Sequence, residues 1–199
     1  MSDAAIIRIF RFRAARKGFD EILRTVMVPD LRASPGLVDV ICGRQGPDDL
    51  GPRILVTIWA SQAAMVSSVG DRLGIFHPEL MGHTTDQLLE FHPIRLDAGT
   101  DDKDPRLLRI LRGTVRPGEL RDYVDEVRSG VAEDTAVGTP PTLIYLAETG
   151  PDAFLTVSAW RSWDDLEQAT GGDVHRPLAT RKPERLVDWD VEYYEIVSD

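Results

Sequence analysis

The 199-residue sequence contains a single cysteine, Cys42, so no disulfide can form within the chain and most cysteine-based metal sites are excluded. We therefore expect a cytoplasmic protein in which Cys42 is a buried, inert thiol. Apolar runs are only as long as a strand and are interrupted by Arg or Asp, so we expect no membrane span. The opening residues, MSDAAIIRIFRFR, do not have the pattern of a signal peptide.

Positive charge is also in short supply, because the formal net charge is −10 at pH 7. An acidic chain is a poor partner for nucleic acid, whose phosphates need a basic surface. The acidity is concentrated in the second half, where residues 101–199 carry a net −9 against −1 for residues 1–100. The sequence also lacks a Walker loop, a G-x-G-x-x-G, a G-x-S-x-G and an H-E-x-x-H, so dinucleotide binding, phosphoryl transfer and serine hydrolysis are unsupported.

What is present is an internal repeat. The stretch ILVTIWAS ends at Ser61 and FLTVSAWRS at Ser162, with Trp59 and Trp160 separated by 101 residues. IIRIFRF and LLRILRG align at the same offset and pair Arg8 with Arg109. Further matches follow in the same order, among them FHPEL with VHRPL and EFHPI with EYYEI. Such ordered matches at a fixed spacing indicate a duplicated unit.

Each unit reads as β-α-β-β-α-β, the ferredoxin-like arrangement, and the fold class is α+β. In the first unit the pattern predicts strands at 4–13, 37–45, 53–60 and 87–96, a helix at 17–33, and a short helix capped by Ser61 or, in the second unit, by Ser162. We expect repeats at 1–96 and 106–199 joined by a polar linker at 97–105. Apolar residues occur on both faces of the strands, so we expect the two antiparallel sheets to pack against each other as an intramolecular pseudo-dimer.

With these features the chain resembles a tandem member of the dimeric α/β-barrel superfamily, close to its antibiotic biosynthesis monooxygenase-like group. The resemblance is carried by a third strand ending in W-x-S, a short helix and a downstream histidine: Trp59, Ser61 and His77 in the first unit, and Trp160, Ser162 and His175 in the second. Most members of the group carry one such unit and form the barrel as homodimers.

The resemblance implies either cofactor-independent oxygenation of polycyclic aromatic molecules or haem binding or degradation. The family also includes proteins with no established chemistry. In the haem-degrading branch an Asn near the end of the first strand acts with the Trp and the His. Phe12 and Gly113 stand at that place here, and neither side chain can donate a hydrogen bond. We therefore expect no cofactor and keep haem as an alternative.

Our candidate catalytic residues are Trp59, His77 and Arg8. An indole at the end of a strand can stack on a flat substrate and donate its N–H. An imidazole in the segment after the second helix can serve as a general base or an axial ligand. An Arg on the parity of Phe10 would point inward, where a carboxylate such as Glu90 or Glu192, or a substrate anion, would have to pair with it.

The candidate ligand-binding residues are aromatic or imidazole side chains on the same strands and loops: Phe10, Phe12, His92, Trp160, His175 and Tyr194. Each also has a purely structural interpretation, as a core side chain or as a loop histidine bonded to backbone. We expect no metal site, and we expect at most one unit, the first, to keep a usable pocket.

Three functions remain open. The first is a cofactor-independent monooxygenase acting on a small aromatic or polyketide-like molecule between sheet and helices. The second is a non-catalytic barrel that binds a small ligand or haem, and the third is a structural or stress-associated barrel. We expect a small aromatic molecule as the partner, no nucleic acid and no membrane; a further homodimer is left open.

Overall fold

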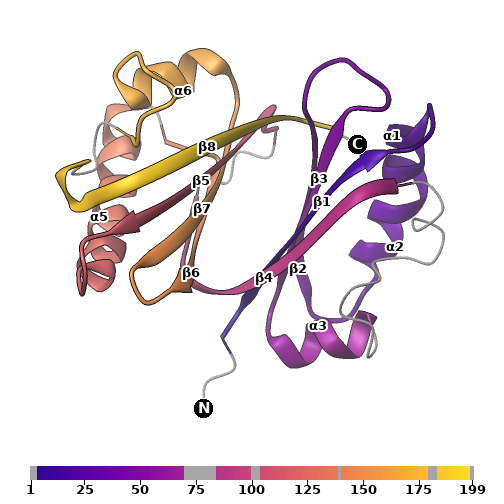
Figure 1. The fold of residues 1–199 in the computed structure, drawn as a ribbon, viewed down its shortest axis with the longest axis horizontal. Coiled ribbons are helices and arrows are strands. Elements are labelled where there is room, and N and C mark those ends of the chain that lie inside the picture. The colour runs from indigo at the N-terminus through magenta and orange to yellow at the C-terminus, as the bar shows by residue number, and fades with distance from the viewer. Residues whose placement is uncertain (1–3, 70–83, 100–103, 139, 179–182, 198–199) are drawn as a thin grey trace. The chain divides into compact units, whose positions relative to one another are not determined.

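The computed structural model describes residues 4–69, 84–99, 104–138, 140–178 and 183–197. These residues divide into two compact units: unit 1 runs to Pro93 and resumes at Tyr194, and unit 2 spans Ile94–Tyr193. Figure 1 shows helices and a sheet in each unit. Within the described residues, no helix is both long enough and apolar enough to cross a membrane.

Unit 1 contains the first β-α-β-β-α series. Its elements are β1 (Ile6–Ala14), α1 (Phe19–Ile22), the π-helix η1 (Leu23–Met27), α2 (Val28–Arg32), β2 (Leu37–Arg44), β3 (Pro52–Trp59) and α3 (Gln62–Val69). Unit 2 repeats the series with β5 (Leu107–Val115), α5 (Leu120–Val137), β6 (Leu143–Gly150), β7 (Ala153–Trp160), α6 (Trp163–Thr170) and a short 3₁₀ turn, η2 (Pro183–Arg185).

The remaining strands, β4 (Thr84–Gly99) and β8 (Leu186–Ile196), contribute to both units. In unit 1 the antiparallel order is β4–β1–β3–β2–β8, with residues 84–93 of β4 on β1 and the end of β8 on β2. In unit 2 the order is β4–β6–β7–β5–β8, with the second half of β4 on β6. The predicted α+β class and the ferredoxin-like fold are confirmed, whereas the tandem duplication and the packing of one sheet on the other stay predictions.

Strand β4 is longer than the sequence pattern predicted. Residues 97–99, expected in the linker, pair with β6 through Asp97↔Tyr145, Ala98↔Ile144 and Gly99↔Leu143. The polar composition of this stretch suggested a connection, but backbone hydrogen bonds form regardless of side-chain polarity. The limits proposed for the two repeats, 1–96 and 106–199, stay predictions.

The helix predicted at 17–33 is present, but a π-helix interrupts it just before Pro29. Proline has no N–H to donate to the fourth residue before it, and its ring crowds that carbonyl, so a widened turn accommodates it. Both predicted serine caps are confirmed. The Oγ of Ser61 accepts from the Ala64 N–H at 3.1 Å, and that of Ser162 accepts from the Asp165 N–H at the same distance.

The helices of each unit lie on one face of its sheet and bury two apolar clusters there. In unit 1 the larger cluster joins β1, β2 and β3 to α1, η1 and α2, and a smaller one joins Ile6 and Trp59 to Met65 of α3. Unit 2 has the same division, with a larger cluster under α5 and a smaller one under α6.

Candidate functional site

A buried arginine lies between the two apolar clusters of unit 1. Arg8 stands between Ile6 and Phe10 on the helix-facing side of β1, directly opposite Thr57 of β3. Its side chain is 1% exposed. Burial lowers the pKa of the Arg8 guanidinium to about 10, because the charged form loses its hydration. The group is still a cation at neutral pH, so the fold keeps a positive charge inside unit 1.

Unit 2 repeats this arrangement at the offset of 101 residues. Arg109 lies opposite Ser158 in the β5–β7 pair and is 3% exposed. Both rows carry an arginine, a hydroxyl residue and, two positions further along the strand, a tryptophan. The constellation of Arg8, Thr57 and Trp59 therefore has a counterpart in Arg109, Ser158 and Trp160.

Both tryptophans are completely buried, and their indoles already donate a hydrogen bond. The Nε1 of Trp59 donates to the Thr57 Oγ1 at 3.0 Å, and the Nε1 of Trp160 donates to the Ser158 Oγ at 3.0 Å. Trp160 packs beneath α6, beside Leu166. These bonds hold the Thr57 and Ser158 hydroxyls on the strand positions that face Arg8 and Arg109. The role of Trp59 and Trp160 toward a substrate stays a prediction.

The surroundings of Arg109 are largely filled by protein. Its Nη2 donates to the backbone carbonyls of Val174, at 3.4 Å, and Arg176. The space beside Arg109, bounded by Ser158, Tyr123 on α5 and Leu178, measures about 20 Å³. A space of this size holds about one water molecule, so the described residues leave no room for an aromatic ligand directly beside Arg109.

Tyr193 contacts Arg109, whereas the tyrosine proposed from the sequence is its neighbour Tyr194. The Tyr193 hydroxyl donates to the Val174 carbonyl, and its ring lies 5.0 Å from Trp163 and 5.9 Å from His175 between centroids. Burial raises the pKa of Tyr193, and the charge and hydrogen bond of Arg109 partly offset that rise. The alternation of a strand places consecutive tyrosines on opposite faces, but it does not say which face carries the arginine.

The other candidate residues of unit 1 lie in two places: two are in the apolar core and two are on the opposite face of the sheet from Arg8. Phe10 and Phe12 stack at 5.0 Å in the core under α1 and η1. His92 lies in register with Ile7, on the opposite face of the sheet from Arg8, and its Nε2 is 3.1 Å from the Glu90 carboxylate. Tyr194 is buried in unit 1, where its Cβ lies against Gly43.

Of the two predicted histidines in the segments after the second helices, His175 lies within the described residues. His175 is exposed; its backbone N–H donates to Asp173, and its carbonyl accepts from the Trp189 indole at 2.9 Å. His77 lies outside the described residues. Of the carboxylates proposed as partners for the arginines, Glu90 pairs with Arg11 and Glu192 lies 3.9 Å from Arg112.

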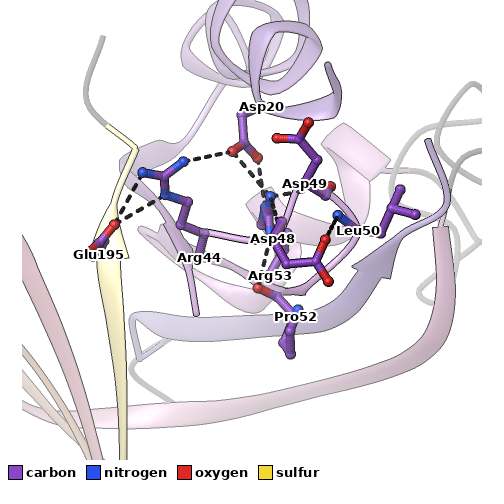
Figure 2. Close-up of polar contacts among 8 residues, drawn as sticks. All are labelled: Asp20, Arg44, Asp48, Asp49, Leu50, Pro52, Arg53 and Glu195. Carbon is purple, nitrogen blue, oxygen red and sulfur yellow. Dashed lines mark hydrogen bonds and ion pairs between the residues drawn. The ribbon is translucent and has the colours of Figure 1, made fainter. Parts of the chain in front are cut away.

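A second buried arginine, Arg53, was not singled out from the sequence. It is 1% exposed at the start of β3, and its guanidinium holds Asp20 of α1 through two hydrogen bonds of 2.7 and 3.2 Å. It also donates to backbone carbonyls of the β2–β3 turn. Figure 2 shows Arg44 extending this network from Asp20 to Glu195. The network links α1, the β2–β3 turn and the end of β8 within unit 1.

Metal coordination has no support in the described part of the chain, where no three His, Cys, Asp or Glu side chains gather closely enough to hold an ion. Arginines and hydroxyls instead dominate the buried polar groups. Such groups donate hydrogen bonds and suit an oxyanion better than a cation.

Comparison with known proteins shows the class of fold. No known protein family and no curated protein matches the sequence. Solved structures do match over nearly the whole chain, which has the α+β, ferredoxin-like fold of antibiotic biosynthesis monooxygenase-related proteins.

Three of these structures illustrate the match. A protein of Lactobacillus acidophilus proposed to be a monooxygenase is 11% identical, with a TM-score of 0.76 over 98% of this chain and 95% of its own. A similarly described protein of Fusobacterium nucleatum is 10% identical, with a TM-score of 0.72 over 100% and 94%. An anthrone oxidase-like protein is 13% identical, with a TM-score of 0.61 over 98% and 92%.

Proposed function

We propose that unit 1 is a cofactor-independent monooxygenase site for a small aromatic or polyketide-like molecule, with Arg8 holding the substrate as an oxyanion. The observation that carries this proposal is the buried Arg8 cation beside the Thr57 hydroxyl on the helix-facing side of the sheet. A fixed cation in a dry site stabilises developing negative charge strongly, because no water has to reorganise around it. The fold shared with monooxygenase-like proteins supports the same reaction class.

The substrate itself supplies the electrons in this reaction. An anthrone-like molecule loses a proton from its ring CH2 group, and Arg8 stabilises the resulting enolate oxygen. The carbanion form reduces O2 and forms a carbon–oxygen bond, giving a hydroperoxide after protonation. Loss of the second hydrogen from that carbon breaks the O–O bond, so that one oxygen atom stays as a carbonyl and the other leaves as water. No external reductant is needed.

Unit 1 is preferred to unit 2 on the ground of charge. Residues 1–100 are nearly neutral, which suits an organic anion better than the acidic second half. The described residues also leave only about 20 Å³ beside Arg109. Within unit 1 we propose Phe10 and Trp59 as the apolar surroundings of the ring and His77 as the base; His92 and Tyr194, on the other face, are not part of this proposal.

Oxygen consumption with 1,8-dihydroxy-9-anthrone at pH 7 tests the proposal. We expect the wild-type protein to accelerate consumption above the protein-free rate and Arg8→Gln to reduce that acceleration by about 100-fold. Arg109→Gln is the matched control and should stay close to wild type. A wild-type rate equal to that of buffer, or equal losses in both variants, would contradict the proposal.

A non-catalytic binding protein is the second candidate. It is favoured by the two indole N–H groups, which are committed to Thr57 and Ser158 within the fold. In this case the anthrone should quench tryptophan fluorescence saturably while O2 consumption stays at the background rate. Titration with haemin tests the haem version, which predicts a Soret shift that His175→Ala or His77→Ala abolishes.

A further inference from the structure

A groove of about 460 Å³ lies on unit 2 beside α5, away from the Arg109 site. Its volume is within the range of small-molecule sites. The groove is bounded by α5, by the turn between β6 and β7, and by the neighbouring strands β4 and β6: Arg95, Gly118, Leu120, Arg121, Val124, Asp125, Arg128, Glu148 and Pro151. All of these residues belong to unit 2.

The helical wall of the groove combines apolar and cationic side chains. Leu120 and Val124 are almost buried and provide an apolar floor. Arg121 and Arg128 are seven positions apart, so they project from the same side of α5 two turns from each other. Arg128 pairs with Asp125 at 2.5 Å, whereas Arg121 makes no ion pair among the described residues. Arg121 is therefore available to a ligand anion.

The strand wall adds a third arginine from a different element. The register of β4 on β6 shifts between Ile94 and Leu96, which puts Arg95 at a bulge. Bulges re-aim side chains that would otherwise follow the alternation of the strand. The guanidinium of Arg95 lies 2.6 Å from the Glu148 carboxylate, which fixes its position across the groove.

In unit 1 the position that corresponds to this groove is filled by a network of charged side chains. There Arg44 and Arg53, opposite each other on β2 and β3, reach Asp20 of α1 under a turn of residues 45–51 (Figure 2). The corresponding pair in unit 2 is Glu148 and Phe154, and the turn is shortened to Pro151 and Asp152. Phe154 turns into the core against Tyr123, at 4.5 Å. Unit 2 therefore has no counterpart of the Arg44–Arg53–Asp20 network among its described residues, and the groove lies at the place that this network fills in unit 1.

We propose that this groove binds a small organic anion that has an apolar body and one carboxylate. The body would lie on Leu120 and Val124, and the carboxylate would accept hydrogen bonds from Arg121 with support from Arg95. Arginine suits this role because its planar fork matches a carboxylate in two parallel bonds. Two of the three arginines, Arg121 and Arg128, also stand out in a half of the chain that carries a net −9.

Calorimetric titration with 2-naphthoate tests the proposal in full-length protein. It is carried out in the Arg8→Gln background, so that binding at the proposed oxygenase site does not contribute. We expect one site per chain, about tenfold weaker in Arg121→Gln, since a hydrogen bond to a charged group is lost. Glu148→Gln should bind more tightly, because it removes a competing carboxylate and releases Arg95. Arg16→Gln, which removes an exposed charge from unit 1, should bind like its parent.

Three results would overturn the proposal: no saturable binding, equal binding of the neutral 2-naphthamide, or equal weakening in Arg121→Gln and Arg16→Gln. Binding of acetate as tight as that of 2-naphthoate would overturn the apolar part of it. Arg121→Gln in the wild-type background should leave O2 consumption unchanged. Failure of the groove and failure of the oxygenase site are therefore distinguishable.

Discussion

Gly113 lies directly opposite Phe154 in the β5–β7 pair, and the Phe154 ring occupies the space that a side chain on Gly113 would need. The matching pair in unit 1 is Phe12 and Arg53. The aromatic ring has thus moved from one strand to its neighbour between the two copies. Facing positions on adjacent strands share one patch of core, so either strand can supply the ring there.

The first prediction is that Gly113→Ala destabilises the protein. A Cβ on Gly113 would lie 2.8 Å from the Phe154 Cζ and 3.0 Å from the Asp188 carbonyl oxygen, so the ring or the strand must shift. Overpacking of this kind costs about 1–3 kcal/mol. Urea unfolding followed by far-UV circular dichroism measures it. Gly150→Ala is the control, because its Cβ would meet the Ala153 Cβ at an ordinary 3.5 Å.

The second prediction concerns the Asp20–Arg53 pair. Asp20→Asn leaves the almost fully buried Arg53 without its carboxylate, and breaking a buried pair in this way costs about 3 kcal/mol, less where one partner is partly exposed, as Asp20 is. We expect a loss of about 2 kcal/mol in the free energy of unfolding. Glu195→Gln removes a carboxylate from Arg44 at a more exposed place and should cost below about 1 kcal/mol. Equal effects would show that burial does not govern this network.

The third prediction separates packing from hydrogen bonding at Trp160. A double-mutant cycle of Trp160→Phe and Ser158→Ala should give a coupling free energy of about 1 kcal/mol, the net contribution of one hydrogen bond. The same cycle with Trp59→Phe and Thr57→Ala should agree with it, since the two bonds have the same length. Additive effects in either cycle would mean that the indole N–H contributes nothing to stability at that site.

The repeat made much of the fold predictable. Matching Arg8 to Arg109 and Trp59 to Trp160 at one offset placed all four on equivalent strands, and the structure keeps each arginine opposite a hydroxyl residue. The serine caps were also predictable, because capping depends on residues three positions apart. Local patterns of this kind need no knowledge of tertiary contacts.

The features that could not be predicted from the sequence depend on contacts between elements far apart in the chain. Arg53 looked like a strand residue near a polar turn, and nothing in its neighbourhood indicated that Asp20, 33 positions earlier, would hold it. The choice between Tyr193 and Tyr194 required the face that carries Arg109. The groove on unit 2 arises from a shortened turn and from Phe154 in place of Arg53, a difference that shows only when the two copies are compared in space.

The last prediction joins stability to function at Arg8. Because burial lowers the pKa of Arg8 to about 10, the folded state bears the cost of holding a charged guanidinium at every pH below that value. Above pH 10 the folded protein releases this proton while the unfolded chain retains it, so the wild type is expected to gain stability as the pH rises through 10. Arg8→Met removes the cost and should stabilise the protein by about 1–3 kcal/mol at pH 7.

The advantage of Arg8→Met should shrink as the pH is raised from 9 to 11, which urea midpoints at each pH can follow. The same variant is expected to lose oxygen consumption with the anthrone, because the cation that holds the enolate is gone. A stabilised, inactive variant is the signature of a charge retained for function at the expense of stability. If Arg8→Met instead unfolds more easily at pH 7, the guanidinium is a structural element, and the oxygenase site has to be sought elsewhere.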